Sequence, residues 1–475
     1  MSNKDSLFNV IKSLSKSEKK RFSQEANLYA AGENKLYVQL FQAIDKQSIY
    51  QEKEIFQKIP TIKTVAQLSS LKNKLYHYLL DIIQASYLQE ETTNNQIYNY
   101  LIQGQALFNR NLPKEGYTIV QKAKKLAILY DKIRFMPLIV GLERNMVRKL
   151  VANNSSITTI HNQLIEEDTN NLQKLINENT YFLYYNQASE WNYPPIKSEL
   201  AIEKELFLEQ FSSYKQANPP TTFIGSSIAI EINNLIHNFQ KEEDILAILN
   251  VWENYPAQQK ELFYNYCSSL NTVFGYYFLD AQFSKAVEIQ ELLYSKACTA
   301  TSEPKTWAKI YENKILVAIY SLKKQLEEDD LKDILQFITT YPNYWNVIYF
   351  LAYYYYCWKD YKEVKFWCNF ILNTNNQDNQ YHSYTLLLVL ATSILQQDEY
   401  HRNGLLHYHA KFLDTLQTES SLFINSLFTF LMDYTNWKSN PVLQQEYFLQ
   451  LNTLSSQYKI EKYALDQIYE QLLLK

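Results

Sequence analysis

Glycine is scarce in this sequence: the chain of 475 residues contains 7 glycines and 11 prolines. An average protein contains about 7% glycine, and the tight turns of a large β protein use it because they need residues with positive φ. The phosphate-binding patterns G-x-G-x-x-G and G-x-x-x-x-G-K-[S/T] do not occur either. The sequence therefore argues against a large β protein and against a nucleotide-binding loop.

Cysteine and long apolar runs are also rare. The four cysteines form no C-x-x-C pair, so no disulfide scaffold is indicated. The longest apolar run, residues 347–358, has about a dozen residues, whereas a transmembrane helix needs about 20. The first residues are polar and charged and lack the apolar stretch of a signal peptide. We therefore expect a soluble, cytoplasmic protein with no membrane partner.

Aromatic residues, by contrast, make up 15% of the chain, and hydrophobic residues recur at helical spacing. The first such stripe consists of Leu7, Val10, Ile11 and Leu14. Ser15 and Glu18 have the spacing of a capping box that starts the next helix. Several prolines lie between stripes, where helices are expected to begin or end: Pro60, Pro113, Pro256, Pro304 and Pro342. The predicted fold class is all-α.

Three segments share a pattern of an aromatic-rich helix, a tight turn and a second amphipathic helix; they lie at residues 100–131, 271–294 and 345–372. Small residues occupy fixed places in them: Gly104, Gly116, Ala286 and Ala352. The pattern resembles the tetratricopeptide repeat (TPR), a helix–turn–helix unit of about 34 residues. The resemblance implies antiparallel helical hairpins stacked into a TPR-like α-solenoid, with an N-terminal helical cap module.

Module boundaries are predicted near residue 95 and near residues 218–222, at the Pro219–Pro220 pair. The predicted modules are an N-terminal helical module at 1–95, a helical-hairpin region at 96–218 and a TPR-like array at 223–475. The segment LFNVIKSLSKSEKKRF, residues 7–22, is similar to the N-terminus of a group of uncharacterised bacterial cytoplasmic proteins with degenerate TPR-like repeats. That similarity implies an architecture and no activity.

The TPR resemblance also implies a binding surface, because the first helices of successive TPR hairpins line a concave groove. Carried onto this sequence, the groove positions give six candidates: Asn271, Phe278, Asn346, Tyr349, Tyr353 and Tyr356. Tyrosine suits recognition because it is large and loses little rotamer entropy. We therefore expect a non-enzymatic scaffold that binds a protein or a peptide. The alternative for each aromatic is a place in the core between hairpins.

Charge is unevenly distributed in the middle of the chain. Residues 110–149 contain ten Lys or Arg against three Asp or Glu, whereas residues 151–218 contain nine acids and four bases. The interpretation we favour is intramolecular attraction between the two stretches. The other is a patch for an acidic partner or for phosphates, and its candidates are Lys122, Lys124, Lys125, Arg144 and Arg148.

An alternative function is a regulator whose N-terminal module binds nucleic acid while the helical array senses a partner. Residues 19–22 and 69–80 would then supply the contact helices. The first 95 residues carry 13 bases against 10 acids, a small excess for binding phosphates. Nucleic acid is therefore the less favoured partner.

No catalytic residue, cofactor or metal site is predicted. His401, His407 and His409 are close in sequence, but residues two apart on a helix face different sides, so a metal site there is disfavoured. An enzyme or metal protein using residues 382–409 is the third hypothesis. The acidic runs at 166–168 and 327–330 are interpreted as helix starts, where carboxylates complement the helix dipole.

Overall fold

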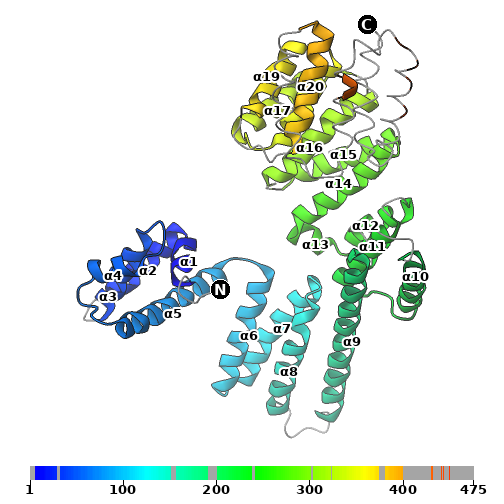
Figure 1. The fold of residues 1–475 in the computed structure, drawn as a ribbon. Helices are drawn as coiled ribbons and strands as arrows, with labels where there is room; N and C mark the ends of the chain where they lie inside the picture. The colour runs from blue at the N-terminus through cyan, green and yellow to red at the C-terminus, as the bar shows by residue number, and fades with distance from the viewer. Residues whose placement is uncertain are drawn as a thin grey trace. The chain divides into compact units, whose positions relative to one another are not determined.

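The structure is a computed structural model that describes residues 6–28, 33–150, 157–190, 200–237, 241–300, 303–322, 324–373, 380–398 and 429–431, with a few single positions between 440 and 449. The regular elements of these ranges are helices, without a strand among them, which confirms the predicted all-α class (Figure 1). None of these helices is long and apolar enough to cross a membrane.

The described residues form two compact units, Met1–Thr180 with Pro220–Thr222, and Tyr181–Pro219 with Phe223 onward. The helices of the first unit are α1 (Ser6–Ser13), α2 (Lys16–Leu28), α3 (Glu33–Asp45), α4 (Glu52–Lys58), α5 (Val65–Gln89), α6 (Thr93–Asn109), α7 (Pro113–Leu129), the 3-10 turn η1 (Ile133–Phe135), α8 (Met136–Leu150) and most of α9 (Ile157–Glu190). The predicted boundaries near residue 95 and residues 218–222 stay predictions.

In its described residues, the second unit continues with eleven further α-helices and one π-helical turn. They are α10 (Leu200–Ala217), α11 (Phe223–His237), α12 (Glu242–Asn254), α13 (Pro256–Glu261), α14 (Phe263–Leu279), α15 (Phe283–Cys298), α16 (Pro304–Leu316), the π-helical turn η2 (Val317–Leu322), α17 (Glu328–Thr340), α18 (Trp345–Cys357), α19 (Tyr361–Leu372) and α20 (Gln380–Gln396). The prolines lie where predicted, because Pro113, Pro256 and Pro304 each occupy the first position of a helix.

The helices α1 to α5 share a hydrophobic core of their own, in which Leu7, Ile11 and Leu14 are buried. Ser15 caps α2 as predicted. The Glu18 amide donates to Ser15 Oγ at 3.2 Å, and the Ser15 amide donates to Glu18 Oε2 at 2.8 Å. This capping box satisfies two amides that the first turn of the helix leaves free.

The three predicted hairpins are present as α6–α7, α14–α15 and α18–α19, and their turns share one geometry. One residue in each turn has a positive φ: Asn111 (64°), Ala281 (57°) and Lys359 (62°). The amide of the next residue donates a hydrogen bond to a carbonyl in the last turn of the preceding helix. Leu112 N donates to Leu107 O at 3.0 Å, and Gln282 and Asp360 make the equivalent bonds in the other two hairpins. Glycine is the usual residue at such helix ends. This chain forms them without it.

Glycine is instead used where α6 and α7 approach most closely. A Cβ on Gly104 would lie 2.6 Å from Val120 Cγ2, and a Cβ on Gly116 would lie 2.9 Å from the Gly104 carbonyl oxygen. Neither position has room for a larger side chain. The prediction that small residues let the two helices meet is confirmed at this hairpin.

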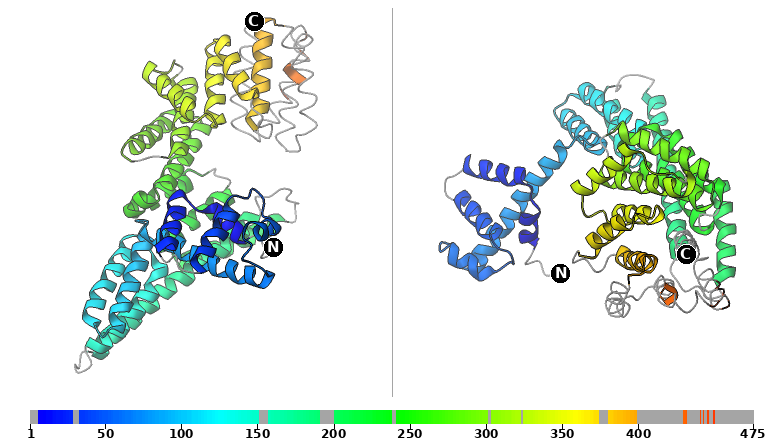
Figure 2. Two further views of the ribbon diagram at one scale, coloured as in Figure 1. Left: turned by 90° about the vertical axis from the view of Figure 1, so that its left-hand side faces the viewer. Right: turned by 90° about the horizontal axis from the view of Figure 1, so that it is seen from above.

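In the second unit, every second α-helix from α14 to α20 lies beside the next. α14 contacts α16, α16 contacts α18, and α18 contacts α20. Figure 2 shows α18, α19 and α20, yellow to orange, packed against one another. Each hairpin therefore buries its apolar face against its neighbours, since a single hairpin cannot enclose a core by itself.

We expect Ala281→Gly to stabilise the protein by up to about 1 kcal/mol, because glycine adopts a positive φ without the steric cost that alanine has. The matched control Ala286→Gly lies inside α15 and should destabilise by at least about 1 kcal/mol, because glycine is a poor helix former. Urea unfolding of both variants measures the two effects. A loss of stability in Ala281→Gly would contradict the turn geometry.

Candidate peptide-binding groove

The structure corrects the predicted groove of the second unit. Phe278, Tyr349, Tyr353 and Tyr356 are only 4%, 8%, 2% and 0% exposed, so these four candidates lie in the hydrophobic core. The cause is that α18 packs against α16, α19 and α20, which leaves nine of its 13 residues buried. A helix covered on so many sides has no free face for a ligand.

The buried tyrosines stabilise the core through their rings and hydroxyls. The rings of Tyr349 and Tyr353 are stacked, with centroids 6.5 Å apart, and the hydroxyls of Tyr353 and Tyr320 are hydrogen-bonded at 2.6 Å. Burial raises the pKa of Tyr349, Tyr353 and Tyr356 well above the ordinary value, because a phenolate would lose its hydration. These side chains are therefore neutral and serve packing.

Asn271 and Asn346, the two remaining groove candidates, are half-buried and already hydrogen-bonded to α16. Asn313 Nδ2 donates to Asn271 Oδ1 at 2.9 Å, and Asn346 Nδ2 donates to Glu312 Oε2 at 2.8 Å. Burial raises the pKa of Glu312, and the bond from Asn346 offsets part of that rise. The two amides therefore join α16 to α14 and to α18.

Among the five basic candidates, Lys124 of α7 lies in a buried ion-pair cluster. Its Nζ is 2.8 Å from Glu143 Oε2 on α8 and 2.7 Å from Glu167 Oε2 on α9, and the Lys124 and Glu143 side chains are 15% and 2% exposed. Gln121 Nε2 also donates to Glu143. Burial acts to lower the pKa of Lys124, but the bonds to both carboxylates outweigh it and the pKa is raised. This cation is therefore not available to a partner.

Two further ion pairs connect the basic stretch to the acidic α9. Arg134 Nη2 lies 2.9 Å from Glu178 Oε1, and Arg144 Nη2 lies 3.5 Å from Asp168 Oδ2. Together with the contact between Lys124 and Glu167, these pairs confirm the intramolecular interpretation for three cations. Lys122 and Lys125 are exposed on α7.

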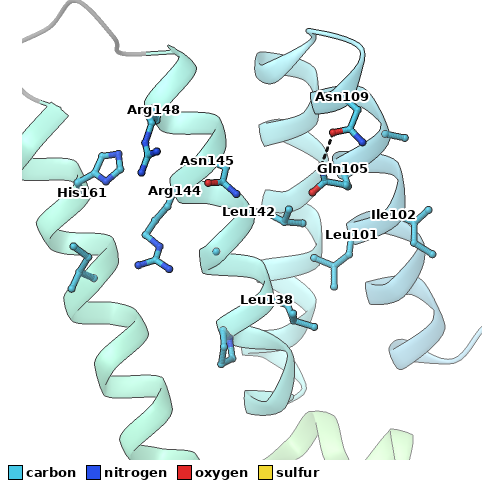
Figure 3. Close-up of a pocket in the computed structure, with 14 residues that line it drawn as sticks. Leu101, Ile102, Gln105, Asn109, Leu138, Leu142, Arg144, Asn145, Arg148 and His161 are labelled. Carbon is cyan, nitrogen blue, oxygen red and sulfur yellow. Dashed lines mark hydrogen bonds between the residues drawn. The ribbon is translucent and has the colours of Figure 1, made fainter.

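A groove lies between α6, α8 and α9 of the first unit, with a volume of about 920 Å³. Figure 3 shows α8 in the middle, with α6 on one side and α9 on the other. The lining residues are Leu101, Ile102, Gln105, Ala106 and Asn109 of α6, Pro137, Leu138, Gly141, Leu142, Arg144, Asn145 and Arg148 of α8, and His161 and Ile165 of α9. Three helices thus contribute apolar, amide and cationic side chains to one surface.

The two ends of the groove differ in chemistry (Figure 3). Arg144, Arg148 and His161 gather between α8 and α9 at one end, whereas Leu138 lies toward the other end of α8 and Ile102 lies across the groove on α6. Leu138 and Ile102 are 60% and 57% exposed. Arg148 is exposed and forms no ion pair with any part of the chain that the structure describes. The arrangement can therefore receive a ligand that is apolar at one end and anionic at the other.

Sequence reasoning identified Arg144 and Arg148 but missed the apolar part of this groove. The available signal was the helical spacing of α8. Leu138 and Arg148 fall on the face opposite Met136 and Glu143, which are buried. Which neighbouring helices would border that face depends on tertiary packing, so spacing alone did not reveal the groove.

No group of His, Cys, Asp and Glu in the described ranges is arranged to hold a metal ion. His382 is buried, and burial lowers its pKa; His401, His407 and His409 lie outside the described residues. The acidic run at 327–330 starts α17 as predicted. The run at 166–168 lies inside α9 instead, where Glu167 pairs with Lys124 of α7 and Asp168 with Arg144 of α8, so the predicted helix start there is wrong.

Compared with known proteins, the chain matches no family model, no curated protein and no solved structure. The TPR resemblance and the similarity of residues 7–22 to the bacterial group stay predictions.

We expect Lys124→Ala to destabilise the protein by about 3–5 kcal/mol, because it leaves the Glu143 carboxylate buried without its cation. The exposed neighbour Lys125→Ala should change stability by less than about 0.5 kcal/mol. The pKa of Lys124 is raised on folding. The contribution of Lys124 to the free energy of unfolding should therefore be present below about pH 10.4 and be lost as the pH rises through the pKa that Lys124 has in the folded protein. Urea unfolding at several pH values tests this; equal effects of the two variants would contradict the buried cluster.

The combined replacement of Tyr349, Tyr353 and Tyr356 by serine should unfold the second unit, because each loss of a buried aromatic ring costs about 3–5 kcal/mol. Tyr353→Phe, which removes only the hydroxyl bonded to Tyr320, should cost about 1 kcal/mol. Thermal unfolding followed by circular dichroism separates the two. An unchanged melting temperature in the triple variant would contradict the burial of these three tyrosines.

Proposed function

We propose that the protein is a cytoplasmic, non-enzymatic scaffold built on TPR-like stacked hairpins, and that it binds a segment of a protein partner. The observation that carries the proposal is the groove of α6, α8 and α9, where large apolar side chains face solvent beside Arg148, which forms no ion pair with the residues that the structure describes. Exposed apolar surface beside unpaired charge is typical of a binding site. The apolar, amide and cationic side chains of the groove support binding.

The repeated hairpin geometry supports the TPR-like part of the proposal. The same turn closes α6–α7, α14–α15 and α18–α19, and in the second unit every second helix from α14 to α20 contacts the next. Stacked hairpins of this kind leave extended surfaces that suit peptide binding. The binding surface that we propose is the groove of the first unit and not the buried tyrosines of the second.

The nucleic-acid alternative gains no support from the N-terminal helices. Lys19 is paired with Asp45 at 2.7 Å, Arg21 with Glu25 at 2.7 Å, and Lys72 with Glu52 at 3.3 Å. These cations lie on the two helices that would contact phosphates. Their pairing reduces the positive field that such binding needs.

We expect a tagged full-length chain to capture one or a few protein partners from its native cytosol, and the capture to survive nuclease treatment. Chemical cross-linking with mass spectrometry should then connect those partners to α6, α8 or α9. Loss of all capture after nuclease treatment would contradict the scaffold and favour the nucleic-acid regulator.

A further inference from the structure

Resting on the proposed function, we infer that the groove of α6, α8 and α9 binds an amphipathic helix of the partner. Apolar side chains of this helix cover Leu138 and Ile102, and carboxylates at one of its ends bind Arg148 and Arg144. The binding mode is that of a helix laid into a groove and anchored by side chains on one face. Four features of the groove lead to this occupant.

The first feature is the register of α8. Leu138, Gly141, Asn145 and Arg148 follow one another at three- and four-residue spacing and therefore share one face of the helix. The stretch from Leu138 to Arg148 is about 15 Å long. A partner helix of about three turns would match that length.

The second feature is an open space at Gly141. A Cβ placed there would meet no atom within 4 Å, in contrast to Gly104 and Gly116, where a Cβ would collide with the adjoining helix. A glycine inside a helix lowers stability relative to alanine, and at Gly141 no packing contact offsets that cost. The missing side chain deepens the groove midway between its apolar and cationic ends, where a bound helix would lie closest to α8.

The third feature is the exposure of large apolar side chains. Ile102, Leu138 and Ile165 are 57%, 60% and 47% exposed, and they come from three different helices. Covering them with apolar side chains of a partner removes this surface from water. Three helices also offer no free backbone edge, so an extended strand could not pair with the groove by main-chain hydrogen bonds.

The fourth feature is the charge at the other end. Arg148 forms no ion pair within the described chain, and Arg144 is 3.5 Å from its one described carboxylate, on Asp168. His161 lies beside them on α9 (Figure 3). A carboxylate pair on the partner would complement this end, because guanidinium groups bind carboxylates in a bidentate geometry.

The groove is open along its length, so a bound acyl chain would stay largely in contact with water. A fatty acid is therefore the less suitable occupant.

The test selects ligands for the folded full-length chain from a displayed library of random peptides of about 16 residues, enough for about four helical turns. Affinities of the recovered peptides are then measured by fluorescence anisotropy against four variants. Gly141→Leu fills the groove and Arg148→Glu reverses its charge. Gly275→Leu is the matched control for size, because a Cβ there also meets no atom within 4 Å, and Lys125→Glu is the matched control for charge.

We expect the recovered peptides to carry apolar residues at helical spacing with Asp or Glu toward one end, and to gain helicity on binding as measured by circular dichroism. Gly141→Leu and Arg148→Glu should each weaken binding at least about tenfold, while both controls leave it unchanged. Melting curves confirm that each variant is folded.

The remaining outcomes separate this inference from the proposed function. Peptides that bind equally well to Gly141→Leu and Arg148→Glu would overturn the inference and leave the scaffold intact. Groove-bound peptides that are basic or non-helical, or displacement of the peptides by dodecanoate at equal concentration, would overturn the proposed occupant. A failure to recover any peptide would overturn the inference and count against the scaffold itself.

Discussion

The buried ammonium of Lys124 connects three helices of the first unit, because it bonds to Glu143 of α8 and Glu167 of α9 from its own place on α7. Removing such charges from water is costly, and the attraction between them compensates only when every partner is in place. The cluster therefore fixes α9 against α7 and α8. The groove depends on this arrangement, since α8 and α9 form two of its sides.

Ion pairs of the first unit also divide the basic stretch into two kinds of cation. Lys124 pairs with Glu143 and Arg134 with Glu178, and these two glutamate side chains are only 2% and 1% exposed. The charges of both cations are therefore used within the fold. Arg148 is directed to the groove and has no described carboxylate beside it. One run of basic residues thus serves both folding and the proposed binding, and only the neighbours of each side chain distinguish the two roles.

Aromatic packing has the corresponding role in the second unit. The rings of α18 contact side chains from neighbouring helices, as Tyr349 does with Tyr384 and Tyr353 with Tyr320. A hairpin can be joined to the next by such contacts because rings are large and hold defined geometries. That use of tyrosine excludes its use as a ligand contact, which is why the aromatic groove positions implied by the TPR resemblance lie in the core.

The sequence by itself determined the all-α class, the three hairpins and the Ser15 cap, because helical spacing, prolines and capping residues act over a few neighbouring positions. It also indicated the attraction between the basic and acidic stretches. Only the tertiary structure decided that Tyr353 is buried, that Lys124 is enclosed and that Gly141 faces open space. The reason is physical: spacing defines the faces of a helix, whereas exposure of a face depends on which distant helices pack against it.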